Sequence, residues 1–334
     1  MDAESILQAA LSAERGASPP AGFTVTRLTG DASPRRYFRV TNGRTSHVMM
    51  LADPFEPARN TFLQVQRFLE ERGVRCPRVH AVDGPSGAIL LDDLGDRLMN
   101  TRLGLAKNAT EEKTLYKKAV DLLLDFHSLT SARPLPGGVD GFALAFDVEK
   151  LMSEIDFTIE HWNGGHLRRD FTDAEKAVIR AEFLKICRRL AKEPRVFTHR
   201  DYHSRNIMVG RKGGLACIDF QDARMGLRQY DLASLLRDSY YRLPEATVEE
   251  LVDHYIRGVA RREKVRLARG AFVKTFDLTA LQRNFKAVGS FCSFHVKRGD
   301  SSYLQYVGHT LENMRRTLLK YPELRRLREV LFGG

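Results

Sequence analysis

Apolar and polar residues alternate in short runs along the N-terminal part of the chain. Side chains of a β-strand point to opposite faces in turn, so this alternation predicts half-buried strands. One helix, over residues 58–72, interrupts them, because its apolar residues recur every three or four positions and Gly73 follows. A short helix is also predicted over residues 1–15. The strands are predicted over residues 23–28, 36–40, 47–51, 79–82 and 88–91.

After residue 92 the apolar pattern changes to the longer period that is typical of amphipathic helices. Two short apolar stretches, 195–198 and 216–220, bracket a loop of charged and polar residues in this part. The pattern therefore predicts a small β-rich lobe, a hinge near residue 92 and a larger helical lobe. The helices are predicted over residues 111–128, 148–162, 172–192, 232–241, 247–265, 277–296, 303–319 and 322–331.

Composition narrows the class of protein. The chain has 334 residues, of which 43% are hydrophobic and 28% charged, as in an ordinary globular protein. No apolar run approaches the ~20 residues that span a bilayer, and the acidic N-terminus lacks the apolar segment of a signal peptide. The four cysteines stand singly, which indicates reduced thiols and no structural zinc. We therefore predict a cytoplasmic protein with no membrane partner.

The net charge of +11 allows a nucleic-acid binder, but also an enzyme for an acidic or phosphate-rich small substrate. The densest basic stretches, 257–269 and 315–328, carry leucines and valines at helical spacing. This pattern indicates solvated faces of amphipathic helices. We therefore predict a small-molecule partner, no nucleic acid, and infer no obligate protein partner.

The polar loop carries the residues that indicate chemistry. His199, Asp201 and Asn206 follow the spacing H-x-D-x-x-x-x-N of a kinase catalytic loop, and Asp219 comes after the next apolar stretch. In phosphoryl transfer, Asp201 would accept the proton of the attacking hydroxyl, while Asn206 and Asp219 would offer oxygens to one or two Mg²⁺ ions on ATP. A surface loop rich in Asp and Asn is the alternative, but it does not explain the apolar stretches on both sides.

Other polar residues near this loop have less distinctive contexts. His199 suits either a catalytic acid or a buried side chain that holds the loop, and we favour the second. Asp231 is interpreted as the N-cap of a helix and as a carboxylate that braces the catalytic loop. No feature of the sequence supports a general-acid role for His203, and Asp222 could serve either bracing or substrate contact.

The motifs resemble those of the aminoglycoside phosphotransferase family. The family pattern H-x-D-x-H-x-x-N, then I-D-W/F-x-D-A and later D-L-A, is matched by residues 199–206, 218–223 and 231–233. Within the family, the sequence resembles the anomeric sugar kinases of bacterial cell-wall recycling, which phosphorylate the C1 hydroxyl of N-acetylmuramate and N-acetylglucosamine. The segments that carry this resemblance are 28–40, 218–223, 230–240 and, more weakly, 281–289.

The resemblance implies an α+β, bilobal, protein-kinase-like fold. Residues 1–91 would form a nucleotide-binding lobe with an antiparallel sheet and one helix, 92–97 a hinge, and 98–334 a helical lobe with the catalytic and metal-binding loops. The sugar would lie near Asp201. The implied ATP-binding residues are Gly30, Asp31, Ser33, Arg35, Arg36, Leu91, Asp92 and Leu94. The candidate sugar contacts are His203, Asp222, Arg237 and Asp238.

The sequence departs from the kinase pattern where a phosphate-binding lysine is expected. No lysine precedes Lys107, so Arg35, Arg36 or Arg39 would have to replace the phosphate-binding lysine. The replacement is not equivalent, because a guanidinium is a planar, forked donor group and an ammonium is a compact point charge. Two alternatives stay open at this point. The acceptor could be an aminoglycoside or a choline-like compound, or the chain could be a nucleotide-binding pseudokinase. The presence of Asp201, Asn206 and Asp219 together speaks against the pseudokinase, because a module that only binds does not need the base.

Overall fold

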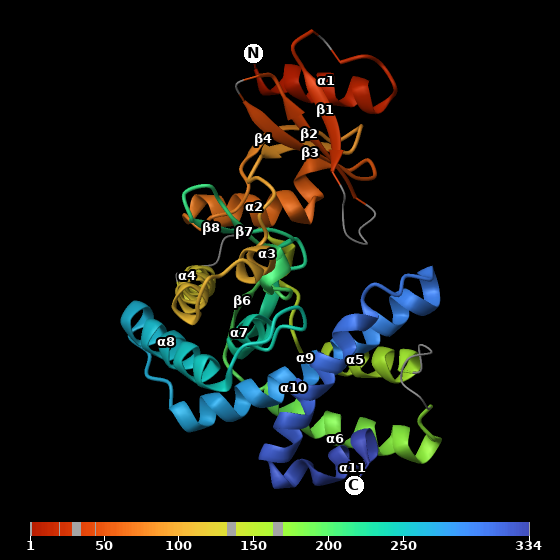
Figure 1. The fold of residues 1–334 in the computed structure, drawn as a ribbon, viewed down its shortest axis with the longest axis vertical. Helices are drawn as coiled ribbons and strands as arrows, with labels where there is room; N and C mark the ends of the chain where they lie inside the picture. Colours follow the sequence, from red (N-terminus) through yellow and green to blue (C-terminus); the bar gives the residue numbers. More distant parts are fainter. Residues whose placement is uncertain are drawn as a thin grey trace. The chain divides into compact units, whose positions relative to one another are not determined.

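A computed structural model describes residues 2–19, 21–28, 35–43, 45–131, 138–162 and 170–333. The chain divides into two compact units (Figure 1). Unit 1 comprises Met1–Arg97, Met208–Asp222 and the described part of Pro136–Asp140, and unit 2 comprises the rest of the chain. The sequence analysis predicted that all residues after 97 belong to the helical lobe. In the structure, residues 208–222 belong to unit 1 instead.

Unit 1 is built on a five-stranded antiparallel sheet with the strand order β1-β2-β3-β5-β4. Every strand agrees with its predicted range to within one residue at either end. The alternation of side chains holds in β2, where Phe38 and Val40 are buried between more exposed neighbours. The strands are β1 (Thr24–Leu28), β2 (Arg36–Thr41), β3 (Ser46–Leu51), β4 (Val79–Asp83) and β5 (Ala88–Asp92).

Two helices accompany this sheet. Helix α1 (Ala3–Glu14) packs its apolar side chains on the sheet core around Val40 and Met49. Helix α2 (Thr61–Glu71) begins three residues later than predicted, because the preceding segment forms a 3₁₀ turn, η1 (Pro57–Arg59). The side chain of Asn60 caps α2 by accepting a hydrogen bond from the Leu63 N–H.

Residues 208–222 join unit 1 through specific contacts. The Cys217 N–H donates to the Arg75 carbonyl at 3.0 Å, and Phe220 stacks on Phe62 of α2 with 5.0 Å between ring centroids. This segment contains most of a small hairpin, β7 (Ile207–Val209) and β8 (Leu215–Cys217). These contacts explain why a segment that follows the catalytic loop in sequence belongs to the sheet-bearing unit.

Unit 2 consists mainly of helices that enclose an aromatic-rich core. A two-stranded antiparallel ladder, β6 (Arg195–Thr198) with β9 (Arg224–Leu227), is the sheet of this unit among the described residues. The remaining 3₁₀ turns are η2 (Leu129–Ser131), η3 (Asp140–Phe142), η4 (Ser204–Asn206), η5 (Leu304–Tyr306) and η6 (Pro322–Leu324). The helices are α3 (Met99–Gly104), α4 (Ala109–Ser128), α5 (Val148–His161), α6 (Asp173–Leu190), α7 (Gln229–Leu236), α8 (Glu245–Glu263), α9 (Arg269–Arg298), α10 (Val307–Lys320) and α11 (Arg325–Phe332).

Helix α9 is the central element of unit 2 and contacts α5, α6, α7, α8 and α10. Its close approach to α5 depends on Gly289, where an added Cβ would lie 2.5 Å from the Thr158 hydroxyl oxygen. The prediction started this helix eight residues too late, at 277. Phe272 and Phe276 are buried and lie four residues apart, so the apolar face continues through the first turns.

Two further differences concern short elements. Helix α3 was not predicted, because six residues give too little periodicity to detect. Helix α7 runs from Gln229 to Leu236 rather than over 232–241, so Asp231 lies in the first turn and the prediction that it is the N-cap is wrong. No helix in the described part of the chain is long and apolar enough to cross a membrane.

Candidate active site

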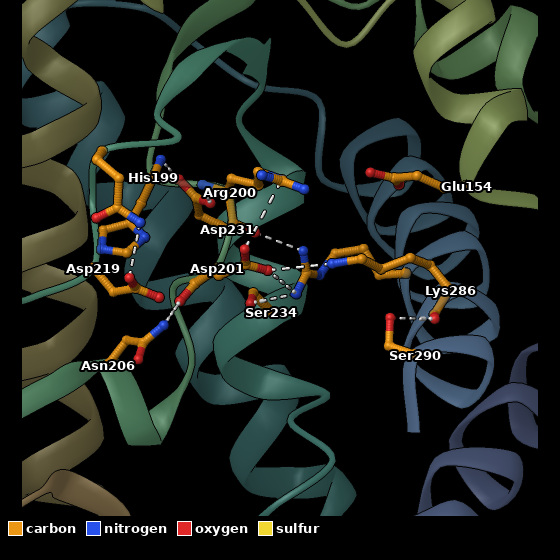
Figure 2. A network of polar contacts seen from close by, with 12 residues as sticks. Glu154, His199, Arg200, Asp201, Asn206, Asp219, Asp231, Ser234, Lys286 and Ser290 are labelled. Carbon is orange, nitrogen blue, oxygen red and sulfur yellow. Dashed lines mark hydrogen bonds and ion pairs between the residues drawn. The ribbon is translucent and has the colours of Figure 1, made fainter. Parts of the chain in front are cut away.

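The catalytic loop follows strand β6 and is held by its own backbone. The Asp201 carbonyl accepts hydrogen bonds from the His203 N–H at 3.0 Å and from the Asn206 side-chain amide at 2.9 Å. The Asn206 N–H in turn donates to the His203 carbonyl at 2.9 Å. Figure 2 shows the contact between Asn206 and Asp201 as a dashed line. These bonds close the loop into a compact turn that fixes where the Asp201 carboxylate can lie.

Asp231 braces this loop from helix α7. Its carboxylate accepts the His199 N–H at 2.7 Å and the Arg200 N–H at 2.9 Å, and the His127 ring nitrogen Nε2 lies 3.1 Å away. Arg200 has φ +81°, the left-handed conformation that non-glycine residues rarely adopt. The His199 side chain is fully buried beside Phe126 and Tyr202. These contacts support the bracing role predicted for Asp231 and the buried position favoured for His199.

Three cationic side chains surround the Asp201 carboxylate. The Lys286 ammonium lies 3.4 Å from Oδ1, an Arg283 guanidinium nitrogen 4.0 Å from Oδ1, and the Arg200 Nε 3.9 Å from Oδ2. Burial by itself would raise the pKa of Asp201, but the charges of Lys286, Arg200 and Arg283 outweigh it and hold that pKa well below its usual value. Asp201 is therefore ionised and a weak base.

Arg283 is anchored by neighbours in unit 2. Its guanidinium donates to the Arg200 carbonyl and to the Ser234 hydroxyl oxygen, both at 2.7 Å, and lies 4.5 Å above the ring of Tyr230. Arg283 and Lys286 were not predicted as site residues. They occur in the segment 281–289 that carried the weaker resemblance. Their role could not be predicted from sequence, because it depends on which face of α9 lies against the catalytic loop.

A pocket of about 190 Å³ opens beside Asp201, and all of its walls belong to unit 2. Three predicted sugar contacts, His203, Arg237 and Asp238, line it, whereas Asp222 is exposed in unit 1 and does not. Helix α9 and the segment after α7 supply its aromatic wall, Tyr240, Phe291 and Phe294.

The three predicted sugar contacts that line this pocket differ in their existing hydrogen-bond partners. Burial lowers the pKa of His203 to about 3, so its ring is neutral near pH 7. Arg237 pairs through two nitrogens with Glu245, at 2.5 and 2.7 Å. Asp238 accepts the backbone N–H groups of Ser204 and Tyr240, each at 2.9 Å. Arg237 and Asp238 are therefore fixed in place, while His203 offers the pocket an uncharged ring.

In unit 1, Asp219 lies two residues beyond the end of strand β8. It has φ +64°, its side chain is about half exposed, and its Oδ1 accepts a hydrogen bond from the Gln221 side chain at 2.9 Å. An Arg35 guanidinium nitrogen lies 4.0 Å from the same oxygen. Arg36 pairs with Glu14. Arg35 is therefore the candidate nucleotide-binding arginine that lies beside the predicted metal ligand.

Arg39, the third candidate for the missing lysine, is held by two carboxylates. It lies 2.8 Å from Asp93 and 2.7 Å from Asp96, and hydrogen bonds from these groups raise its pKa further. Asp93 also accepts the Gly95 N–H, so it orders the predicted hinge, a role that the sequence did not indicate. The predicted residues Gly30, Asp31 and Ser33 lie outside the described residues.

The other predicted nucleotide contacts lie at the end of β5. Leu91 is buried and paired with Val48 of β3. The Asp92 carboxylate accepts the Arg78 N–H at 3.2 Å and contacts the His80 ring nitrogen at 2.7 Å. Leu94 is half-buried in the segment that follows. Asp92 thus has structural partners within unit 1.

The two predicted magnesium ligands, Asn206 in unit 2 and Asp219 in unit 1, can be judged by the atoms that each offers. Because the Asn206 amide nitrogen donates to Asp201, its amide oxygen is the atom that could bind a metal, and Asp219 adds a carboxylate. The described residues contain no group of three or more His, Cys, Asp or Glu side chains placed to hold a metal ion. Mg²⁺ accepts few protein ligands when phosphate oxygens and water supply the others. Each residue thus carries an oxygen of the kind that Mg²⁺ prefers, and their joint role as magnesium ligands stays a prediction.

A sheet-bearing unit, a helical unit and a braced H-x-D-x-H-x-x-N loop define a phosphotransferase with a protein-kinase-like fold. Solved structures agree. A choline/ethanolamine kinase family protein from Mesorhizobium loti has a TM-score of 0.61 at 15% identity, with 93% of each chain covered. The aminoglycoside phosphotransferase APH(2'')-Ib, bound to ADP, has a TM-score of 0.59 at 17% identity, with 95% of this chain and 99% of that chain covered. The predicted fold class is confirmed.

Sequence comparison identifies the family. The model of the phosphotransferase enzyme family, APH, matches residues 24–267, and the chain belongs to this family. It is 34% identical to a protein named N-acetylmuramate/N-acetylglucosamine kinase from Pseudomonas putida, over 93% of this chain and 88% of that protein. A protein of the same name from Neisseria meningitidis serogroup B is 30% identical, over 92% and 89%. These findings confirm the predicted family and the prediction of a phosphotransferase.

Proposed function

We propose that this enzyme transfers the γ-phosphoryl group of Mg-ATP to the C1 hydroxyl of N-acetylmuramate and N-acetylglucosamine, as a sugar kinase of cell-wall recycling. The names of its relatives support this substrate class. The observation that carries the proposal is the pocket beside Asp201, where cationic and aromatic side chains meet the catalytic loop.

The charge of the pocket favours these acceptors over cationic ones. Arg237, Arg283 and Lys286 line it, against the carboxylates of Asp201 and Asp238. A polycationic aminoglycoside or a quaternary choline would meet like charges there. In N-acetylated sugars the amide has replaced the charged amine, so N-acetylglucosamine is neutral and N-acetylmuramate is anionic. Both are compatible with the pocket, and its aromatic wall suits the apolar face of a sugar ring.

The weak basicity of Asp201 favours the anomeric hydroxyl. A hemiacetal hydroxyl is more acidic than an ordinary alcohol, because the adjacent ring oxygen withdraws electrons from C1. A base works best when its pKa is matched to its task, and an acidic hydroxyl needs only a weak base. Asp201 would accept a hydrogen bond from this hydroxyl, orient its oxygen toward the phosphorus and take the proton as the new bond forms.

The proposal keeps the roles that the sequence motifs predicted for the remaining residues. Asn206 and Asp219 would hold Mg²⁺, which offsets the charge of the triphosphate. Arg35 would contact a phosphate in place of the missing lysine. The hinge contacts predicted for Leu91, Asp92 and Leu94 stay predictions, as does the cytoplasmic location.

An ADP-release assay with Mg-ATP tests the proposed function. The acceptors are N-acetylmuramate, N-acetylglucosamine, kanamycin and choline, with a blank that lacks acceptor. We expect turnover of the two sugars alone, and phosphorus NMR should show an anomeric phosphate ester. Turnover of kanamycin or choline instead, or phosphate on another hydroxyl, would contradict the proposal. ATP binding without any turnover would restore the pseudokinase alternative.

A further inference from the structure

We propose that Lys286 is a further catalytic residue, whose ammonium donates a hydrogen bond to the acceptor oxygen while Asp201 takes the proton. This inference rests on the proposed function, because it assigns a role in the same transfer. In that step the bond between the acceptor oxygen and phosphorus forms as the phosphorus–oxygen bond to ADP breaks. The bonding pair leaves with ADP, and the acceptor proton passes to Asp201.

The position of Lys286 supports this role. It reaches the catalytic loop from helix α9, and Figure 2 shows its side chain directed at the Asp201 carboxylate. Its Nζ lies 3.4 Å from Asp201 Oδ1, its side chain is 20% exposed, and it lines the pocket. Among the described residues, Asp201 is the hydrogen-bond partner of this ammonium, which has three N–H donors. Two donors therefore remain for a bound acceptor.

The other two cations near Asp201 lie farther from its carboxylate than Lys286 does, Arg200 at 3.9 Å and Arg283 at 4.0 Å. Arg283 donates to the Arg200 carbonyl and to Ser234, which fixes its guanidinium. The bond from Arg200 to Asp231 is made by the backbone N–H and fixes the main chain of the loop. Lys286 lies nearest to the carboxylate, at 3.4 Å, and is hydrogen-bonded to it. Because an acceptor hydroxyl must lie within hydrogen-bond distance of Asp201, an ammonium beside the same carboxylate oxygen is within reach of that hydroxyl.

The same geometry separates this role from recognition of the muramate carboxylate. The lactyl group is attached at C3, two ring carbons away from C1, whereas Lys286 contacts the group that acts at the C1 oxygen. Lys286 should therefore serve both sugars equally. An ammonium bound to the acceptor oxygen orients that oxygen and lies next to the transferred phosphoryl group, whose oxygens carry the charge in the transition state. Its loss therefore affects kcat rather than ground-state binding.

The test compares Lys286→Met and Lys286→Arg with wild type on both sugars. We expect Lys286→Met to lower kcat by about 10²-fold or more on N-acetylmuramate and on N-acetylglucosamine alike, with little change in KM. Lys286→Arg keeps the charge and should recover part of the loss. Lys274→Met is the matched control, because Lys274 lies on the same helix and pairs with the exposed Glu323 at the protein surface.

The division of the effect between kcat and KM separates catalysis from recognition of the acceptor. A variant within twofold of wild type would overturn the proposal, as would a loss confined to KM for N-acetylmuramate, which would assign Lys286 to the lactyl carboxylate. Wild type inactive on both sugars would instead refute the proposed function.

Discussion

Replacing Asp231 by asparagine tests how the catalytic loop is held. The carboxylate accepts two backbone N–H groups, at 2.7 Å from His199 and 2.9 Å from Arg200, and is fully buried. Asparagine has the same shape but a single acceptor oxygen. Its NH₂ group would face one of the two N–H donors, so that donor would lose its partner in a buried environment.

The expected cost follows from these two bonds. Hydrogen bonds to charged groups contribute about 1.5–3 kcal/mol, and neutral ones about 0.5–1.5 kcal/mol. Losing one bond and weakening the other therefore costs about 2–4 kcal/mol. The left-handed conformation of Arg200 itself costs about 1–2 kcal/mol, so the weakened brace would let this residue relax. Asp201 is the next residue, and a displacement of about 1 Å in a reacting group can cost about 10²-fold in rate.

Two measurements check this prediction for Asp231→Asn. The first is kcat with Mg-ATP and N-acetylglucosamine, which should fall by about 10²-fold. The second is urea unfolding followed by the fluorescence of Trp162, the single tryptophan, which packs against Phe285 within unit 2. Asp253→Asn, a change at the surface of α8, is the control. A variant with kcat within threefold of wild type and the same unfolding midpoint would refute the bracing role.

Three other changes test separate parts of the site. Asp201→Asn should lower kcat by about 10²–10⁴-fold while ATP still binds in a calorimetric titration, and near wild-type turnover would remove the base assignment. Arg35→Met should raise KM for ATP about tenfold or more, because it removes a charge-assisted contact with a phosphate. Arg27→Met, at an exposed position of strand β1, is the control and should leave KM for ATP unchanged. Equal effects of the two substitutions would contradict the role of Arg35. Burial lowers the pKa of His203 from 6.5 to about 3, so the unfolded chain binds this proton at a higher pH than the folded chain does. The stability of the wild-type protein should therefore fall as the pH drops from about 6.5 toward 3. His203→Gln should show a shallower loss of urea midpoint over that range, and parallel curves for the two proteins would argue against a buried neutral ring.

The sequence predicted what depends on local pattern. The strand boundaries followed from alternation because each strand packs one face on a core, as Phe38 and Val40 show in β2. The catalytic loop was found because its chemistry needs Asp201 and Asn206 at a fixed spacing within one turn. A motif whose residues lie within one turn can be recognised from the sequence without knowledge of the tertiary structure.

The sequence did not predict contacts that depend on how helices pack. Arg283 and Lys286 follow Asp201 by more than eighty positions, and nothing local distinguishes them from the other cations of a basic chain. Asp231 was predicted to brace the loop, but its predicted position as the N-cap was wrong, because helix α7 starts three residues earlier than predicted, at Gln229. Such errors arise because helix ends are set by tertiary contacts as much as by capping residues.

The total charge of the chain was a poor guide to function, whereas the placement of a few charges is informative. The cations at Asp201 lower its proton affinity, which would be a disadvantage if the base had to remove a proton early in the reaction. Phosphoryl transfer passes through a loose transition state in which the acceptor keeps its proton until late, so charge stabilisation and orientation matter more than basicity. An ionised Asp201 that orients the hydroxyl, together with Lys286 beside the same oxygen, suits this order of events. This arrangement also suits the anomeric hydroxyl, because the higher acidity of that hydroxyl compensates for the low basicity of Asp201.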